Sequence, residues 1–202
     1  MNILAIVGSY RKHQTIDQLV DAALAGATAG RSGDTVEKIF LADRRIAYCR
    51  NCHACKRADP ALPLAPCVIH DDMDDLLPKL DAADALILGT PVNLGTATAV
   101  LKTFLERACW TLAKPGHHPI DGCPAPRHRK PRRAIILVSA GTVPPWLRWF
   151  CDDATSLLKS WCDSILGAKV VGSLYAGAVE SRGVEIYKPK AQALGRRLQP
   201  AG

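Results

Sequence analysis

The chain has 202 residues, of which 48% are hydrophobic and 22% are charged, and this composition excludes a disordered chain and a fibrous repeat. Its net charge of +7 depends on one short basic run that holds Arg127, Arg129, Lys130, Arg132 and Arg133. We therefore do not expect nucleic acid as a partner, since nucleic-acid binding favours a broad basic surface.

The chain opens with an apolar run, Ile3 to Val7, that predicts a buried strand. The run is too short for a signal peptide or a membrane span. Eight cysteines are many for a compartment that keeps thiols reduced, so we expect thiols that serve chemistry rather than disulfides. The expectation is a cytoplasmic protein that does not bind a membrane.

The loop after this strand, Gly8 to Thr15, leads into a helix whose apolar residues recur from Ile16 to Leu24. Unpaired N–H groups at a helix N-terminus favour a phosphate, and the loop matches neither a dinucleotide fingerprint nor a Walker A sequence. A monophosphate site is one reading. The other is an ordinary capped helix, with Thr15 as N-cap and Gln18 completing a capping box. The candidate phosphate contacts are Ser9, Arg11, Lys12, His13, Gln14 and Thr15.

Half of the cysteines fall in the segment 46–70, as Cys49, Cys52, Cys55 and Cys67. Three cysteines at steps of three with a fourth farther on is a spacing used for four-iron clusters. Zinc is a competing metal, although structural zinc sites usually pair C-x-x-C units. Buried free thiols, a redox-active pair and the remnant of a cluster site are the remaining alternatives.

Strand and helix patterns alternate along the rest of the chain. The further predicted strands are Thr35 to Leu41, Ala85 to Leu88, Ala134 to Val138 and Lys169 to Tyr175, and the further predicted helices are Ala97 to Ala108, Ala154 to Ile165 and Pro189 to Leu198. This alternation favours a parallel sheet covered by helices on both faces, with ligands bound beyond the carboxyl ends of the strands. Glu37 and Lys38 place their strand at the sheet edge. The proline-rich segment 114–133 predicts a long loop.

Several of these segments together resemble the NADPH-dependent FMN reductase and iron-sulfur flavoprotein branch of the flavodoxin-like superfamily. The matching motifs are Gly8-Ser9-Tyr10-Arg11-Lys12, the cysteine segment with Asp71-Asp72-Met73, the strand and loop from Ala83 to Asn93, and the helix from Leu101 to Arg107. They cover residues 1 to about 110, and the last third matches only in its pattern of strands and helices.

The resemblance implies a flavodoxin-like three-layer sandwich with a five-stranded parallel sheet in the order 2-1-3-4-5. It implies non-covalent FMN, with the phosphate in the first loop and the ring at Thr90, Pro91, Val92, Asn93, Leu94 and Gly95. Ser139 and Gly141 follow the fourth central strand, and their loop either meets the other side of the ring or is an ordinary strand-to-helix turn. We name no catalytic residue, because the cofactor carries the chemistry. We place an FMN-binding domain at 1–183, including the cysteine-rich loop 46–70 and the basic loop 114–133, and a C-terminal helix and tail at 184–202.

We therefore expect an FMN-dependent NAD(P)H oxidoreductase that transfers hydride from a reduced nicotinamide to FMN and on to a small-molecule or protein acceptor. One alternative is an iron-sulfur flavoprotein electron carrier without nicotinamide activity, whose [4Fe-4S] cluster is held by the four cysteines. Another is a module that binds nucleic acid or a protein partner through the basic run, which could equally be solvated or hold the adenosine phosphate of NADPH. The resemblance also implies a homo-oligomer. Trp110, Trp146 and Trp149 fall near the predicted ligand face, where they serve either the subunit contact or core packing.

Overall fold

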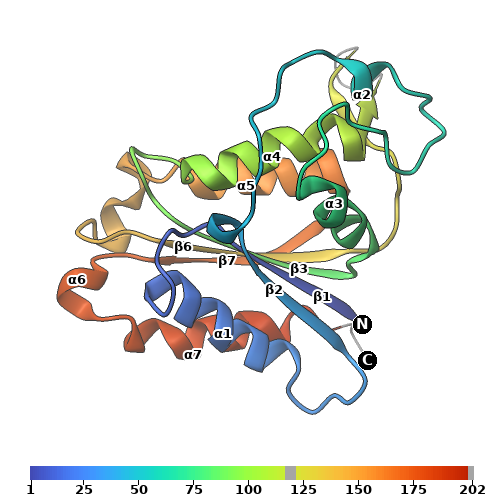
Figure 1. Ribbon diagram of the computed structural model, residues 1–202. Coiled ribbons are helices and arrows are strands. Elements are labelled where there is room, and N and C mark those ends of the chain that lie inside the picture. The colour runs from blue at the N-terminus through green and yellow to red at the C-terminus, as the bar shows by residue number, and fades with distance from the viewer. Residues whose placement is uncertain (117–121, 200–202) are drawn as a thin grey trace.

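A five-stranded parallel sheet lies at the centre of the computed structural model, which describes residues 1–116 and 122–199 (Figure 1). Its strands are β1 (Asn2–Val7), β2 (Thr35–Phe40), β3 (Ala85–Pro91), β6 (Arg133–Ser139) and β7 (Lys169–Ala176). They are ordered β2-β1-β3-β6-β7, and every neighbouring pair is parallel. This confirms the predicted 2-1-3-4-5 order, because β4 and β5 lie outside this sheet.

Helices cover both faces of the sheet and complete the predicted three layers (Figure 1). On one face lie α1 (Thr15–Ala27) and α7 (Lys188–Arg196), and on the other lie α3 (Met73–Ala82), α4 (Ala99–Leu112) and α5 (Ala154–Trp161). Short helical segments are α2 (Ala54–Arg57), α6 (Val179–Arg182), the 3-10 turns Leu41–Asp43, Pro145–Phe150 and Glu185–Tyr187, and the π turn Cys162–Leu166. Among the described residues, no helix combines the length and apolar character that a membrane span requires.

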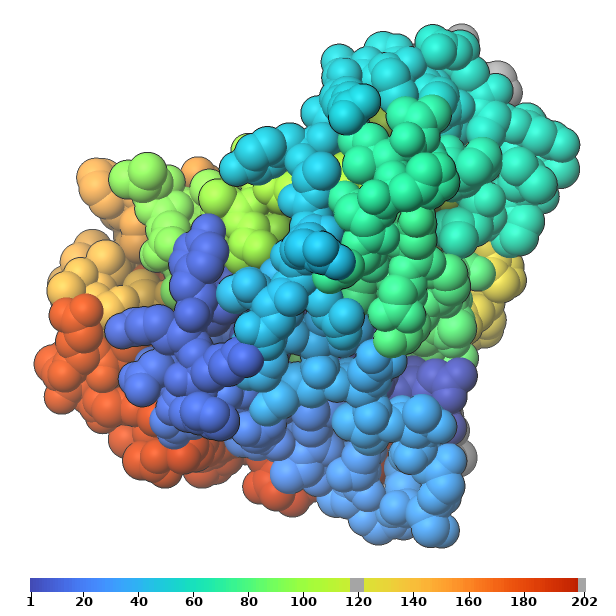
Figure 2. All heavy atoms as spheres, in the orientation of Figure 1, coloured from blue at the N-terminus to red at the C-terminus, as the bar shows by residue number. Residues whose placement is uncertain are grey.

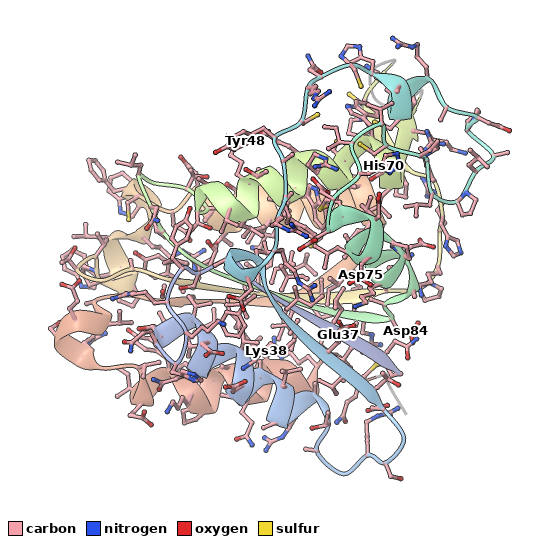
Figure 3. All side chains as sticks on the ribbon, in the orientation of Figure 1. Glu37, Lys38, Tyr48, His70, Asp75 and Asp84 are labelled. Atoms are coloured by element: carbon pink, nitrogen blue, oxygen red, sulfur yellow. The ribbon has the colours of Figure 1, made fainter. Side chains whose placement is uncertain are left out.

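Two apolar cores hold the layers together, one on each face of the sheet. Because strand side chains alternate between faces, Leu4 and Ile6 of β1 join the core under α3, α4 and α5. Ile3 and Val7 join the core under α1 and α7. The edge strand β2 is tied to α3 by Lys79, whose ammonium lies 2.7 Å from Glu37 and 2.9 Å from Asp75 (Figure 3).

The C-terminal helix α7 packs directly on α1, and two glycines allow this close approach. A Cβ atom at Gly195 would lie 1.9 Å from the carbonyl oxygen of Ala23, and one at Gly26 would lie 2.0 Å from that of Gln192. Such distances are far below van der Waals contact. The two backbones therefore touch at positions where no larger residue fits.

The segment 114–133 is not the uninterrupted loop that its prolines predict. Strand β4 (Ala113–Pro115) pairs antiparallel with β5 (Pro124–Pro126), and β6 begins already at Arg133. Proline is tolerated here because a two-stranded ribbon has free edges on which a missing N–H breaks no hydrogen bond. Residues 117–121 of this predicted loop and 200–202 of the predicted tail lie outside the described residues.

Candidate functional site

The loops after β1, β3 and β6 meet at a cavity of about 410 Å³ beyond the carboxyl ends of the strands. The lining residues are Arg11, Gln14, Thr15, Pro91, Val92, Asn93, Ser139, Gly141, Val179 and Glu180. All but Val179 and Glu180 were predicted as site residues. Parallel strands place their carboxyl ends at one edge, and this brings together three loops that are far apart in sequence.

Some side chains of the first loop that were predicted to bind the phosphate do not line the cavity. Ser9 is buried, and its hydroxyl accepts a hydrogen bond from the Arg11 N–H, so it stabilises the loop itself. Lys12 lies 2.6 Å from the carboxylate of Asp43. The His13 side chain is 92% exposed. Neither Lys12 nor His13 lines the cavity, whereas Arg11 does.

The alternative reading of this loop, a capping box formed by Thr15 and Gln18, is wrong. Gln14 is the N-cap residue, without a side-chain cap, and Thr15 is the first residue of the helix. The Gln18 amide donates to the carbonyl oxygen of His13, a residue with a left-handed backbone and a φ of 58°. This leaves the Thr15 side chain at the cavity.

Asp17 holds the first loop in place. Its side chain is 1% exposed, accepts a hydrogen bond from the His13 N–H and lies 2.7 Å from the ammonium of Lys38, a β2 residue labelled in Figure 3. Burial alone would raise the pKa of Asp17, but the hydrogen bonds from Lys38 and His13 hold it below its usual value. The carboxylate therefore stays ionised and fixes the loop.

The second loop, Thr90 to Gly95, is held to the rest of the site by its backbone. The Val92 N–H donates to the carbonyl oxygen of Ser139 at 2.7 Å, which joins the second loop to the third. Asn93 and Thr96 exchange two backbone hydrogen bonds around a two-residue turn, in which Leu94 and Gly95 have φ values of 48° and 80°. Leu94 consequently extends into solvent, and Pro91, Val92 and Asn93 face the cavity.

Two buried threonines support this loop. The Thr90 hydroxyl accepts from the Thr98 N–H and donates to the carbonyl oxygen of Pro91. The Thr98 hydroxyl caps α4 by accepting from the Leu101 N–H, and it donates to the carbonyl oxygen of Gly8 at 2.6 Å. Thr98 thereby couples the first loop to the second. Sequence reasoning missed it because the helix was predicted to begin at Ala97, although a threonine near a predicted helix start is a usual N-cap signal.

The third side of the cavity comes from the loop after β6 together with α6. The Val179 N–H donates to the carbonyl oxygen of Ala140, and the Glu180 N–H donates to that of Gly141 at 3.0 Å. Sequence reasoning missed Val179 and Glu180. A signal existed, because both follow the fifth strand closely and parallel strands present their ligand sites at that end.

The side chains at the cavity fit a phosphate ester such as FMN. Arg11 contributes a guanidinium, Gln14 an amide and Thr15 a hydroxyl, beside the unpaired N–H groups and the positive dipole end of α1. Asn93 and Ser139 add polar groups where the resemblance places the ring. The donor set therefore suits an anion at one end of the cavity and a polar ring edge at the other.

The cysteine-rich segment 46–70 forms a separate projection, seen as the cyan and teal lobe at the upper right of Figure 2. Tyr48 and His70, labelled in Figure 3, mark its two ends. Cys49 and Cys52 are exposed, whereas Cys55 and Cys67 are half-buried, and all are free thiols.

In the part of the chain that the structure describes, no three histidine, cysteine or acidic side chains are grouped to hold a metal ion. The assignment of Cys49, Cys52, Cys55 and Cys67 as metal ligands stays a prediction. Burial, with the neighbouring Cys67 and Cys49 thiols, raises the pKa of Cys55. Burial likewise raises the pKa of Cys109 on α4 to about 11, with Cys55 and Cys49 contributing.

Arg107 of α4 fastens both ends of this segment. Its side chain is 1% exposed and donates to the carbonyl oxygens of Ala47 at 2.8 Å and Ile69 at 3.2 Å. It also pairs with the Asp71 carboxylate through two nitrogens, and one of them lies 3.8 Å from the sulfur of Cys67. Sequence reasoning had named Arg107 only as part of a motif.

The basic run is largely structural rather than a solvated loop. Arg127 is buried and donates to the carbonyl oxygens of Ala113, Asp59 and Cys55. Arg132 is buried and donates to the carbonyl oxygen of Leu166 and to Asp81, and Arg133 donates to the carbonyl oxygens of Arg197 and Gln199. Lys130 donates to the carbonyl oxygen of Ala82 and pairs with Asp84 at 3.2 Å, so four of the five cations hold other parts of the fold in place.

Known proteins are similar to this chain in sequence and in fold. The family model described as NADPH-dependent FMN reductase matches residues 1–181. An iron-sulfur flavoprotein of Archaeoglobus fulgidus is 36% identical over 119 residues, which are 59% of this chain and 49% of that protein. One of Methanosarcina thermophila is 36% identical over 108 residues, which are 54% of this chain and 52% of that protein. The chain thus spans about half the length of these curated relatives.

Solved structures show the same fold. An azoreductase of Bacillus anthracis str. Sterne has a TM-score of 0.72 at 16% identity, covering 97% of this chain and 99% of that chain. The NAD(P)H:quinone oxidoreductase from Methanothermobacter marburgensis has a TM-score of 0.70 at 19% identity, covering 98% and 99%. At these identities the likeness shows the flavodoxin-like fold alone.

Proposed function

The chain belongs to the NADPH-dependent FMN reductase family, and from this premise we propose that it is an FMN-dependent NAD(P)H oxidoreductase. The observation that carries the proposal is the convergence of three strand-end loops on one cavity of about 410 Å³. The donor groups of the cavity suit a ligand with a phosphate at one end and a polar ring at the other. A cavity without such donors would not support the proposal.

The residues of the cavity bind and orient FMN. Arg11, Gln14 and Thr15 hold the phosphate at the N-terminus of α1, and the ring lies between the second loop, with Asn93, and the third, with Gly141. The hydrogen bond from the Val92 N–H to Ser139 fixes the separation of these two loops. A rigid spacing of this kind favours a planar ligand.

When bound, FMN supplies the redox chemistry, accepting hydride at its N5 from NADPH or NADH and delivering electrons to a small-molecule or protein acceptor. The chain's own part is to bind and orient. Pro91 and Val92 form an apolar side of the cavity that limits water beside the ring. The proposal requires no acid or base from the protein.

Adjacent cations in the first loop give a matched test. Arg11 lines the cavity, whereas Lys12 pairs with Asp43 outside it. We expect Arg11→Ala to weaken FMN binding roughly 10- to 150-fold, the range for a hydrogen bond to a charged group. Lys12→Ala should stay within about 3-fold of the unsubstituted protein, as expected for an exposed ion pair. Fluorescence quenching titrations measure both.

Riboflavin, which lacks the phosphate, should bind Arg11→Ala and the unsubstituted protein equally. NADPH and NADH oxidation by the FMN-loaded protein then measures the activity. Equal FMN affinity in the Arg11 and Lys12 variants would contradict the assignment of the phosphate to this loop. Absence of oxidation of either nicotinamide by the loaded protein would contradict the proposed activity.

A second candidate function is a flavoprotein electron carrier without nicotinamide activity. It is favoured by the cysteines Cys49, Cys52, Cys55 and Cys67 and by the name of the similar proteins, iron-sulfur flavoprotein. Anaerobic reduction of the protein as purified separates the two candidates. Reduction by dithionite but by neither NADPH nor NADH would establish the carrier, and iron and sulfide analysis would show whether the cysteine lobe is loaded.

We also propose a homo-oligomer in the cytoplasm. The 3-10 turn after the third loop leaves Trp146, Trp149 and Phe150 exposed by 74%, 76% and 79%, which is unusual for large apolar side chains on a monomer. Trp110 does not join them, since it lies under the ammonium of Lys56. Light scattering at several concentrations measures the assembly state.

The proposal of a cytoplasmic location rests on the cysteines. All eight are free thiols, as in a reducing compartment.

A further inference from the structure

A carboxylate lies in the same cavity as the proposed phosphate site. Glu180 lines the cavity, and its Oε1 atom lies so close over the third loop that a Cβ at Gly141 would be 2.4 Å away. Its backbone is fixed there by the hydrogen bond from its N–H to Gly141. A carboxylate accepts hydrogen bonds and repels anions. It must therefore face a part of the ligand that carries a donor rather than the phosphate.

Other acidic side chains next to the site already have cationic partners. Asp17 pairs with Lys38, and Asp43 pairs with Lys12. In the described ranges, none of the ion pairs includes Glu180. Its side chain is exposed at the cavity and available to a ligand.

The sheet order separates this carboxylate from the phosphate loop. Glu180 follows β7, but its carboxylate lies over Gly141, which follows β6, and Arg11 follows β1, with β3 between β1 and β6. At ~4.8 Å between neighbouring strands, the ends of β1 and β6 are roughly 10 Å apart. A ligand whose phosphate lies at Arg11 therefore meets Glu180 with its opposite end, which in FMN is the isoalloxazine ring.

The oxidised isoalloxazine ring carries one N–H group, the imide at N3. We propose that Glu180 recognises the flavin by accepting a hydrogen bond from this imide N–H. The inference rests on the proposed function and goes beyond it, because it assigns the ring end of the site to a residue outside the motifs of the resemblance. A charged acceptor makes this hydrogen bond stronger than a neutral one. Glu180 then selects flavins against phosphorylated ring compounds without a donor at this place.

The test pairs a protein change with a ligand change. FMN and 3-methyl-FMN, in which a methyl group replaces the imide hydrogen, are titrated by fluorescence quenching into the unsubstituted protein and into Glu180→Ala. We expect Glu180→Ala to bind FMN roughly 10- to 150-fold more weakly, as for loss of a charged hydrogen bond. The unsubstituted protein should lose a similar factor with 3-methyl-FMN, whereas Glu180→Ala should bind the two flavins alike.

Two further variants serve as controls. Glu185→Ala removes a nearby glutamate that pairs with Lys188 outside the cavity, and it should bind FMN as the unsubstituted protein does. Glu180→Gln keeps the size and a neutral acceptor, so it should show a smaller loss, about 3- to 10-fold. Thermal unfolding shows whether each variant folds. If Glu180→Ala does not fold, Glu180→Gln still tests the role of the carboxylate.

The outcomes separate the inference from the proposed function. If the Glu180 variants bind FMN as tightly as the unsubstituted protein, the inference is overturned and the proposed function stands. The same holds if Glu180→Ala weakens FMN and 3-methyl-FMN equally, because the carboxylate then meets another donor such as a ribityl hydroxyl. If the unsubstituted protein binds no flavin, the proposed function fails and the inference fails with it.

Discussion

Replacing Arg107 by methionine should loosen the cysteine-rich segment and lower the stability of the fold. The Arg107 side chain is 1% exposed, and that of its partner Asp71 is 11% exposed. The substitution removes the guanidinium from Asp71 and leaves the carbonyl oxygens of Ala47 and Ile69 without these hydrogen bonds. Removing one partner of a buried ion pair costs about 3–5 kcal/mol. The lost hydrogen bonds to the carbonyl oxygens come from the same guanidinium. We therefore expect the unfolding free energy to fall by about 3–5 kcal/mol in all, and not by that amount plus a further loss for each hydrogen bond.

Urea unfolding followed by circular dichroism measures this free energy, and limited proteolysis measures the exposure of residues 46–70. The substitution Asp71→Asn should relieve part of the loss. The double variant, Arg107→Met with Asp71→Asn, should therefore lose less stability than the sum of the losses of the two single variants. Arg44→Met is the control, because Arg44 is 32% exposed and 4.0 Å from Asp75; it should change stability by less than about 0.5 kcal/mol. A loss below about 1 kcal/mol for Arg107→Met, or an unchanged cleavage rate in the segment, would refute the reasoning.

Other predictions concern packing, pH and the basic run. Gly195→Ala puts a Cβ 1.9 Å from the Ala23 oxygen and should lower the unfolding free energy by about 1–3 kcal/mol; an unchanged urea midpoint would contradict this. The pKa of Asp17 is lowered and that of Asp34 is about 2, so both stabilise the fold above pH ~4 and lose this effect as pH falls through their native pKa values; a midpoint that is flat from pH 6 to 2 would argue against it. Arg127→Ala should lower the thermal midpoint and leave the KM for NADPH within about 2-fold, since its guanidinium holds backbone carbonyls; a raised KM at unchanged stability would show a cofactor role.

Much of the fold could be predicted from the residue patterns of buried and edge strands. The apolar runs at Ala85 and Ala134 lie in central strands because both of their faces are covered, and Glu37 and Lys38 are tolerated in β2 because it is an edge strand. Since parallel strands end at one edge, the loops at Arg11, Pro91 and Ser139 had to meet. The general place of the site was therefore predictable.

The details that remained hidden depend on backbone geometry or on partners distant in sequence. Glu180 reaches the cavity because Ala178 has a left-handed φ of 53°, which redirects the chain after β7 and which no residue type there indicates. Arg127 appeared as one charge in a basic run, and its burial depends on the carbonyl oxygens of Asp59 and Cys55. Sequence spacing likewise could not show that Cys49 and Cys52 are exposed while Cys55 and Cys67 are half-buried.

The central claim, that this cavity binds FMN with its phosphate at the first loop, is tested most directly by a crystal structure of the protein grown with FMN. We expect one FMN per chain, its phosphate within hydrogen-bond distance of Arg11 and Thr15, and its ring between Pro91 and Gly141. A ring bound elsewhere on the molecule, or a cavity without FMN at saturating concentration, would contradict it.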